Sequence, residues 1–101
     1  MVKYSRESDS VFDAVSHEIR RKILIRLLEK PATVMELAHP FDVSLPAITK
    51  HLHILEKANL IIRRKEGRTY VLSLHSKPLL QIKRWLLFYE QAWIKELESI
   101  E

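Results

Sequence analysis

The chain contains no cysteine, and this absence excludes several kinds of chemistry at once. Disulfide bonds, thiolate metal sites and cysteine nucleophiles all need a residue that is missing. The 101 residues include a single glycine, Gly67, so there is no glycine-rich loop of the kind that binds phosphate groups in nucleotide-dependent enzymes. Neither a thiol-dependent nor a nucleotide-dependent activity is expected.

Long apolar segments are also missing. No run approaches the ~20 apolar residues that a membrane-spanning helix needs, and the opening MVKYSRESDSVF has no apolar core of a signal peptide. Hydrophobic residues make up 47% and charged residues 30% of the chain, which is the balance of a folded protein. We therefore expect residues 1–101 to form one cytoplasmic domain without a membrane partner.

The positive charge is concentrated in one part of the chain. Residues 1–43 hold seven Lys/Arg and seven Asp/Glu, and residues 71–101 hold four of each. Residues 44–70 hold six positive and two negative side chains, so this segment carries the whole net charge of +4. A solvated basic face is one interpretation, and contact with nucleic-acid phosphates is the other.

The N-terminal part predicts two short helices, the first over residues 9–15. Ser16 is expected as the N-cap of the second helix, and Pro31 as its end. The buried face of this second helix has helical spacing and consists of Ile19, Ile23, Leu24, Leu27 and Leu28. Three arginines are expected on its other faces: Arg20, Arg21 and Arg26.

The next segment has the pattern of a helix-turn-helix unit. Thr33 and Glu36 have the spacing of a capping box, which predicts a third short helix, and Pro40 ends it. A tight connection leads to a fourth helix with Ser44 as its N-cap and Pro46 in its first turn. Two short helices with a tight turn between them are typical of this DNA-binding motif.

The fourth helix is the expected recognition helix. Its buried stripe is Ile48, Leu52 and Leu55, and Asn59 fits the left-handed position after its last turn. The outward side chains of its N-terminal half are expected to contact base edges and phosphates: Ser44, Leu45, Pro46, Thr49, Lys50 and His53. His51 is expected to pack against the protein, partly buried.

Two β-rich runs follow, over residues 60–65 and 68–74. They are joined at Glu66 and Gly67, where a hairpin turn needs a residue with positive φ. Tyr70, Leu72 and Leu74 alternate with smaller or polar residues, as in a half-buried strand. The tip of the hairpin is basic, as in a DNA-contacting wing. Its cations are Arg63, Arg64, Lys65 and Arg68.

A long final helix over residues 77–98 has more apolar surface than one core requires. One stripe consists of Ile82, Leu86, Tyr89, Trp93, Leu97 and Ile100, with Trp85, Phe88 and Ala92 on a second face. A helix that covers a single core needs one apolar stripe of ~100°. The extra aromatic width predicts packing against the same helix of a second subunit, and a broad core-facing helix in a monomer is the alternative.

Five histidines raise the question of a metal site. His51 and His53 lie two residues apart on a helix, so their side chains point about 200° away from each other and cannot share an ion. The other three, His17, His39 and His75, lie near predicted element boundaries. No nucleophile motif such as G-x-S-x-G is present. We therefore expect no metal, no cofactor, no catalytic residue and no enzymatic activity.

Residues 11–74 resemble the ArsR-type (arsenic-repressor) winged-helix family without an obvious gap. The strongest pieces are SLPAITKHL at residues 44–52 and RRKEGR at residues 63–68. The resemblance implies a cytoplasmic prokaryotic homodimer that represses transcription at an inverted-repeat operator in double-stranded DNA. It also implies a dimer interface built by the first and last helices, for which the candidates are Phe12, Trp85, Phe88, Tyr89 and Trp93.

Metal-sensing members of that family carry a cysteine pair before the recognition helix or His/Asp pairs along the last helix. Here the third helix reads VMELAHPF, and no His or Asp lies between Lys77 and Glu101. The resemblance is therefore to a metal-independent subgroup, some of whose members repress their own genes.

Taken together, the sequence predicts a mainly helical fold with a small β-hairpin: four helices, a two-stranded antiparallel wing and a long C-terminal dimerisation helix. The expected function is sequence-specific DNA binding by a homodimeric repressor, and no motif identifies an inducing ligand. A winged-helix module that binds an acidic partner protein remains an alternative, as does a metal-responsive repressor.

Overall fold

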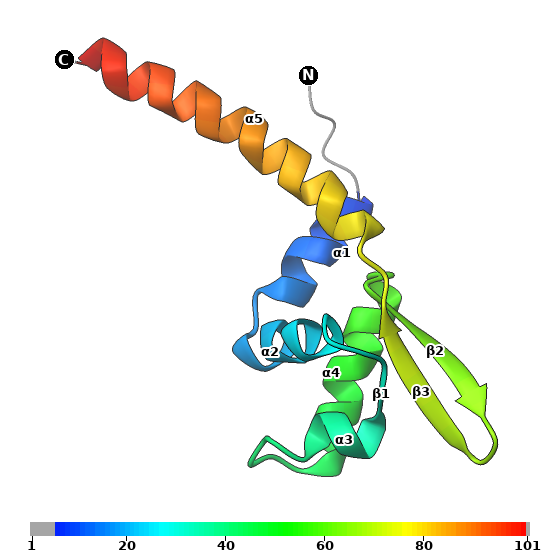
Figure 1. Cartoon of the computed structure of the whole chain (residues 1–101). Coiled ribbons are helices and arrows are strands. Elements are labelled where there is room, and N and C mark those ends of the chain that lie inside the picture. Colours follow the sequence, from blue (N-terminus) through cyan, green and yellow to red (C-terminus); the bar gives the residue numbers. More distant parts are fainter. Residues whose placement is uncertain (1–5, 101) are drawn as a thin grey trace.

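The structure is a computed structural model, and it describes residues 6–100. In chain order the elements are α1 (Arg6–Val15), α2 (Glu18–Leu27), β1 (Ala32–Thr33), α3 (Val34–Ala38), α4 (Leu45–Lys57), β2 (Ile61–Glu66), β3 (Thr69–Leu74) and α5 (Lys77–Ile100). The first four helices and the base of the sheet form a body, from which the β2–β3 hairpin and α5 project to opposite sides (Figure 1). The molecule measures 59 × 26 × 23 Å. The predicted mainly helical fold with a β-hairpin wing is confirmed.

The core lies where the helices of the body meet the base of the sheet. The predicted inward stripe of α4, Ile48, Leu52 and Leu55, is completely buried. Ile61 of β2 and Leu72 of β3 are buried beside it. One face of α4 is therefore held by the core, which leaves the opposite face to solvent.

Local signals in the sequence account for the limits of α3 and α4. The Thr33 hydroxyl accepts from the Glu36 N–H at 3.2 Å, and the Glu36 carboxylate accepts from the Thr33 N–H at 3.2 Å. The Ser44 hydroxyl accepts from the Ala47 N–H at 3.2 Å. Asn59, after the end of α4, has the left-handed φ of 60°. The predicted capping box, N-cap and left-handed residue are all confirmed.

The boundary between α1 and α2 differs from the prediction. Helix α1 begins at Arg6, three residues earlier than expected. The N-cap of α2 is His17, whose Nδ1 accepts from the Ile19 N–H at 3.2 Å. The predicted cap, Ser16, instead donates its hydroxyl to the Asp13 carbonyl oxygen at 2.6 Å and so belongs to the end of α1. Either of two adjacent polar residues can cap a helix. The spacing of the apolar residues in the sequence does not indicate which of the two is the cap.

Two further predictions for α2 are wrong. Arg20 was expected on an outer face, yet it is only 7% exposed. Its Nε donates to the Ala14 carbonyl oxygen at 2.8 Å, and its Nη2 donates to the Asp13 carbonyl oxygen at 3.0 Å. Both carbonyls lie in the last turn of α1, where the negative end of the helix dipole favours a buried guanidinium. Leu28 was expected to be buried and is 70% exposed; it is the C-cap residue that follows the last turn of α2.

The wing belongs to a three-stranded antiparallel sheet with strand order β1-β3-β2, where two strands were predicted. The added strand β1 has two residues and pairs Ala32 with Leu72 and Thr33 with Val71. A segment this short has no alternation that reveals it in the sequence. Gly67 has a φ of 62° at the hairpin turn, as predicted.

The burial of β3 follows the predicted alternation only at the base of the hairpin. Leu72 is buried and Leu74 is partly buried, but Tyr70 is exposed. The hairpin projects beyond the core, so the residues near its turn have no neighbouring layer to pack against (Figure 1).

Helix α5 continues to Ile100, slightly past the predicted end. Its first half contacts the body through Ile82, which is buried, and through Trp85. Its second half leads away from the body (Figure 1), and Leu86 and Leu97 of the predicted stripe are exposed. The side chains of Trp93 and Ile100 lie outside the described residues. None of the helices within residues 6–100 is both long and apolar enough to span a membrane.

Candidate nucleic-acid interface

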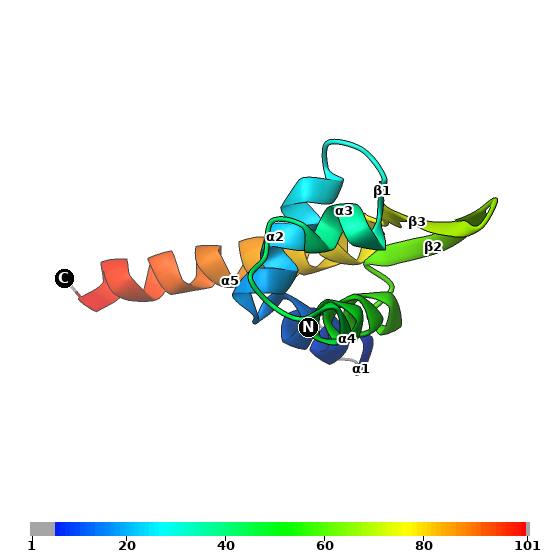
Figure 2. The ribbon, with the colours of Figure 1, turned by 90° about the horizontal axis from the view of Figure 1, so that it is seen from below.

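The N-terminal end of α4 lies at the surface of the molecule, on the side of the body away from α5 (Figure 1). Seen from below, α4 is viewed nearly end-on, beside α1 and α3 (Figure 2). All six residues predicted to contact DNA from this helix are exposed: Ser44, Leu45, Pro46, Thr49, Lys50 and His53. The burial of the opposite stripe of α4 places these six on one accessible surface.

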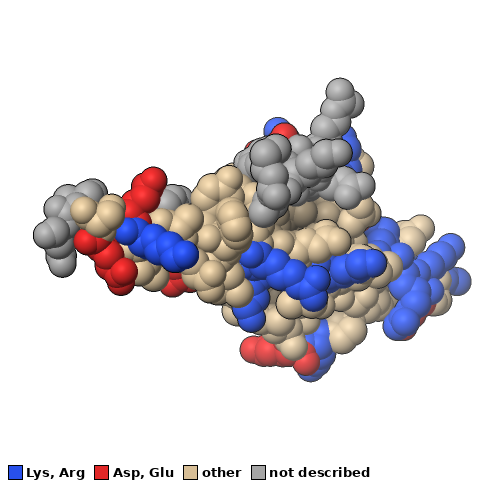
Figure 3. Space-filling view, turned by 90° about the horizontal axis from the view of Figure 1, so that it is seen from above, with Lys and Arg blue, Asp and Glu red and all other residues tan. Residues whose placement is uncertain are grey.

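The wing adds positive charge beside this helix. The hairpin turn and the N-terminal end of α4 point to the same end of the molecule (Figure 1). The four predicted wing cations are all exposed: Arg63, Arg64, Lys65 and Arg68. Lys and Arg side chains gather over the wing, whereas acidic side chains gather near the far end of α5, which carries Glu96 and Glu98 (Figure 3). We call the six α4 residues and four wing cations the recognition surface.

Arg63 has a structural partner that the sequence did not reveal. Its Nη2 and Nε donate to one carboxylate oxygen of Glu56 at 2.7 and 3.1 Å, and its guanidinium lies 5.2 Å from the centre of the Tyr70 ring. Glu56 is on α4, so this ion pair joins the wing to the recognition helix. The strand register could have indicated the Tyr70 contact, because Arg63 pairs with Leu72 and Tyr70 is two residues from Leu72 on the same face.

The other cations of the recognition surface differ in availability. Arg64 pairs with Glu66 at 2.6 Å, but both side chains are exposed, so this pair contributes little stability. Within residues 6–100, Lys50, Lys65 and Arg68 take part in no ion pair. Among the described residues, these three members of the recognition surface therefore have no charged partner.

The buried Arg20 also supports the recognition helix from behind. Its Nη1 lies 3.1 Å from Nδ1 of His51, which is on α4, and the rings of His17 and His51 are 4.5 Å apart. A guanidinium has no acceptor, so His51 accepts through Nδ1 and its ring is neutral with the proton on Nε2. Burial, together with the nearby His17, Arg20 and Lys50, lowers the pKa of His51 below its ordinary value. The expectation that His51 is partly buried is confirmed.

Metal ligands do not gather in the described part of the chain. Within residues 6–100, no group of three or more His, Cys, Asp or Glu side chains is placed to hold a metal ion.

Four of the five aromatic residues predicted for a dimer interface form one continuous cluster. Phe12 of α1 packs edge-on against Trp85 with ring centres 5.2 Å apart. Trp85 lies 4.4 Å from Tyr89, and Tyr89 lies 5.6 Å from Phe88. We call these four residues the aromatic cluster. Its outer member, Phe88, is 55% exposed.

A helix-turn-helix with an exposed second helix and a basic wing is the architecture of DNA-binding transcriptional regulators. The model of the family described as "Bacterial regulatory protein, arsR family" matches residues 17–63, from the N-cap of α2 into the wing.

Full-length relatives extend this match to most of the chain. The chain is 35% identical to the transcriptional repressor SdpR of Bacillus subtilis over 79 residues, which cover 78% of this chain and 88% of that protein. It is 33% identical to the HTH-type transcriptional regulator Rv2034 of Mycobacterium tuberculosis over 92 residues, which cover 91% of this chain and 83% of that protein. A crystal structure of an ArsR family transcriptional regulator is similar with a TM-score of 0.84 and 36% identity, covering 92% and 96% of the two chains.

The chain therefore belongs to the ArsR family. It is a DNA-binding transcriptional regulator with a winged helix-turn-helix fold, and it is not an enzyme.

Proposed function

We propose that this protein is a homodimeric repressor that binds an inverted-repeat operator in double-stranded DNA and does not depend on a metal ion. The observation that carries the proposal is the recognition surface, where the exposed face of α4 and the basic wing lie at one end of the molecule. Repression follows if the bound dimer blocks access of RNA polymerase to the operator, including an operator in front of its own gene.

The roles of the individual residues follow from their chemistry. Thr49 has a short hydroxyl side chain suited to a base edge, and Leu45 and Pro46 can meet the methyl group of a thymine. Lys50 and His53 can donate to phosphates or to guanine acceptors. Among the wing cations, Lys65 and Arg68 extend the contact along the DNA backbone, and Arg63 also holds the wing against α4 through Glu56.

The aromatic cluster and the projecting half of α5 support dimerisation. Phe88 is exposed, and α5 continues well beyond the body that its first half covers. A second copy related by a twofold axis can bury the same surface on both chains. Such a dimer places two α4 helices in successive major grooves, about 34 Å apart along the DNA.

Metal independence rests on the side chains that are present. The sequence has no cysteine. Residues 77–101 contain neither His nor Asp, so the His/Asp pairs that bind metal on the last helix of metal-sensing members are missing.

The first test is fluorescence anisotropy with the intergenic DNA upstream of the protein's own gene, titrated with salt beside a scrambled duplex. We expect at least ~10³-fold preference for the upstream DNA. If each subunit makes three or four cationic phosphate contacts, the slope of log K against log salt is about −5 to −7. The proposal is contradicted if the protein binds both duplexes equally weakly and also shows no preference for any fragment of a genomic library. That result would favour an acidic protein as the partner.

A further inference from the structure

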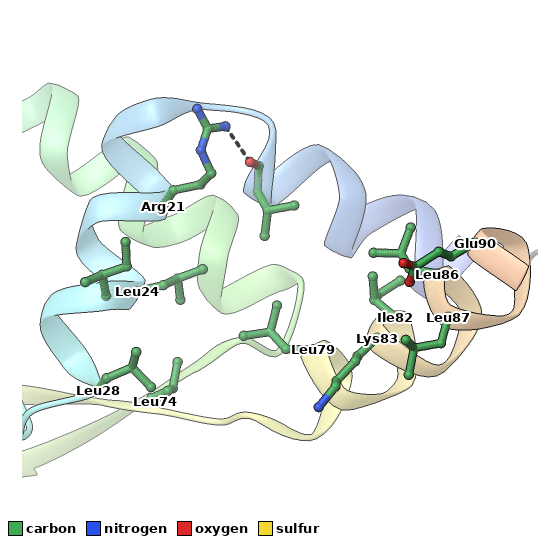
Figure 4. A pocket seen from close by; sticks show the side chains of 12 residues that line it. Arg21, Leu24, Leu28, Leu74, Leu79, Ile82, Lys83, Leu86, Leu87 and Glu90 are labelled. Atoms are coloured by element: carbon green, nitrogen blue, oxygen red, sulfur yellow. Dashed lines mark hydrogen bonds between the residues drawn. The ribbon is translucent and has the colours of Figure 1, made fainter. Parts of the chain in front are cut away.

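A second surface of α5, separate from the aromatic cluster, forms a groove with α2 (Figure 4). The α2 side of the groove presents Leu24, Ile25 and Leu28, and the α5 side presents Leu79, Leu86 and Leu87. The cavity has a volume of about 500 Å³, which is within the usual range of small-molecule sites of ~300–1,000 Å³. We call it the α2–α5 groove.

The walls of the α2–α5 groove are aliphatic. Ile25 is 63% exposed and Leu87 is 46% exposed, and Leu28 beside them is the residue that was expected to be buried. Among the described residues, no aromatic ring lines the groove, so these walls offer no flat surface on which a planar ligand would stack. Walls of branched aliphatic side chains suit a flexible hydrocarbon chain.

Charged side chains lie at the edges of these walls. Arg21 and Lys83 carry positive charge there, and Glu90 is the one acidic residue among the described residues of the lining. Arg21 donates Nη1 to the Val15 carbonyl oxygen at 2.8 Å, as Figure 4 shows, which leaves its other N–H groups for a ligand. Within residues 6–100, neither Arg21 nor Lys83 takes part in an ion pair. Figure 4 shows Arg21 and Lys83 on opposite sides of the groove, so each is a separate cation that can pair with an anionic group.

The groove also has a defined length along α5. Its lining on α5 runs from Leu79 to Glu90, which corresponds to roughly 16 Å along the helix axis. A long, open apolar groove with a cation at its margin matches a molecule that has one extended alkyl chain and one carboxylate.

We propose that the α2–α5 groove is a binding site for a free single-chain fatty acid. The alkyl chain lies between Ile25 and Leu28 of α2 and Leu87 of α5, and the carboxylate accepts from Arg21 or Lys83. The bound acid would touch α2, which packs behind α4, and α5, which carries the aromatic cluster. It is therefore placed to alter the angle between them and so DNA affinity, a consequence that rests on the proposed function.

The binding test uses the full chain without DNA, titrated by calorimetry with sodium laurate below its micelle concentration. We expect saturable binding of one laurate per chain. Leu87→Ser should weaken this binding by about tenfold or more, because it removes part of the apolar wall. Leu80→Ser is the matched control, since Leu80 is on the same helix, is 53% exposed and does not line the groove. Circular dichroism establishes that both variants fold.

The charge at the edge is tested by Lys83→Gln and Arg21→Gln. Together they should weaken binding of laurate while leaving binding of the uncharged alcohol dodecanol unchanged. No saturable binding of laurate, or equal losses in the Leu87 and Leu80 variants, would overturn the proposal. So would binding to phosphatidylglycerol vesicles without binding to free laurate, which would indicate a membrane surface as the occupant.

A second copy of the chain is the remaining occupant to distinguish. If Leu87→Ser converts a dimer to a monomer in the absence of laurate, the groove belongs to the subunit interface and the proposal is overturned. Operator binding with and without laurate is measured separately. Failure to bind any DNA contradicts the proposed function and leaves the laurate result intact, whereas laurate binding without a change in operator affinity overturns the coupling.

Discussion

Helix α4 and helix α5 are both amphipathic, but they stand in different relations to the rest of the chain. The inward stripe of α4 is completely buried, and its outward face is polar and basic apart from Leu45 and Pro46. Helix α5 buries Ile82 against the body and leaves apolar side chains exposed on more than one face, including Phe88 and Leu87. A single chain buries the apolar stripe of α4 completely, whereas it leaves part of the apolar surface of α5 exposed.

This difference separates two kinds of function. A helix whose apolar face is fully used within the chain can present polar residues at fixed positions, which suits recognition of DNA. A helix with surplus apolar surface has free energy available for association, either with a second chain or with an apolar ligand. Variants of each helix test whether α4 recognises DNA while α5 associates with a second chain or an apolar ligand.

The largest effect is expected at Arg20, which holds α4 from behind. Arg20→Leu removes two hydrogen bonds to carbonyl oxygens of α1 and the contact with His51. The free energy of unfolding should fall by about 2–4 kcal/mol, measured by urea denaturation. The control is Lys22→Leu, whose ion pair with Glu18 is exposed on both sides and therefore contributes little stability. Equal losses in the two variants would mean that Arg20 does not hold α4.

The next largest effect concerns the surplus surface of α5. Phe88→Glu places a charge in the exposed part of the aromatic cluster and should weaken dimerisation by about 100-fold, which is ~2.7 kcal/mol. Sedimentation equilibrium measures the dissociation constant, and the unfolding of the monomer should change little. Leu80→Glu, at an exposed position of the same helix outside the cluster, is the control. A monomeric parent protein would contradict the interpretation of α5.

A smaller effect separates charge from sequence recognition on the recognition surface. Lys50→Ala or Arg68→Ala should weaken binding to all DNA sequences, and each should reduce the salt slope by about 1 because one cation no longer neutralises a phosphate. Thr49→Ala should instead change the preference between operator variants, by about 1–3 kcal/mol at the base it contacts. Anisotropy titrations on specific and scrambled duplexes measure both. If all three variants affect both duplexes equally, the assigned roles are wrong.

The smallest effect is a pH dependence at His51. Its pKa is lowered in the folded protein, chiefly by burial, so the unfolded chain binds the proton more tightly. The stabilising contribution is fully present above the ordinary histidine pKa of 6.5 and is lost as the pH falls below it, towards the lowered folded pKa. His51→Gln should therefore lose less stability than the parent between pH 7.5 and 5.5.

Elements that depend on neighbouring residues in the chain were predictable. The Thr33–Glu36 capping box, the Ser44 N-cap and the positive φ of Gly67 each involve residues within a few positions of one another. Their energetics do not depend on what packs against them. The same reasoning failed at Ser16 and His17, because two polar residues in succession offer two local solutions of similar energy.

Contacts between distant segments were not predictable. The burial of Arg20 depends on the end of α1 meeting α4, and its partner His51 is 31 residues away. The pairing of Arg63 with Glu56 depends on the angle at which the wing leaves α4. Strand β1 exists because Ala32 and Thr33 lie beside β3, not because of their own preference.

By itself, the sequence determined the helix-turn-helix, the wing and the exposed residues of the recognition surface, because helical and strand periodicity decide which side chains share a face. The tertiary structure alone decided what lies behind and beside that surface: the buried Arg20, the Arg63–Glu56 bridge and the α2–α5 groove. These features depend on how far apart and at what angle two elements pack. That geometry is the result of the whole core, and no single segment of the sequence contains it.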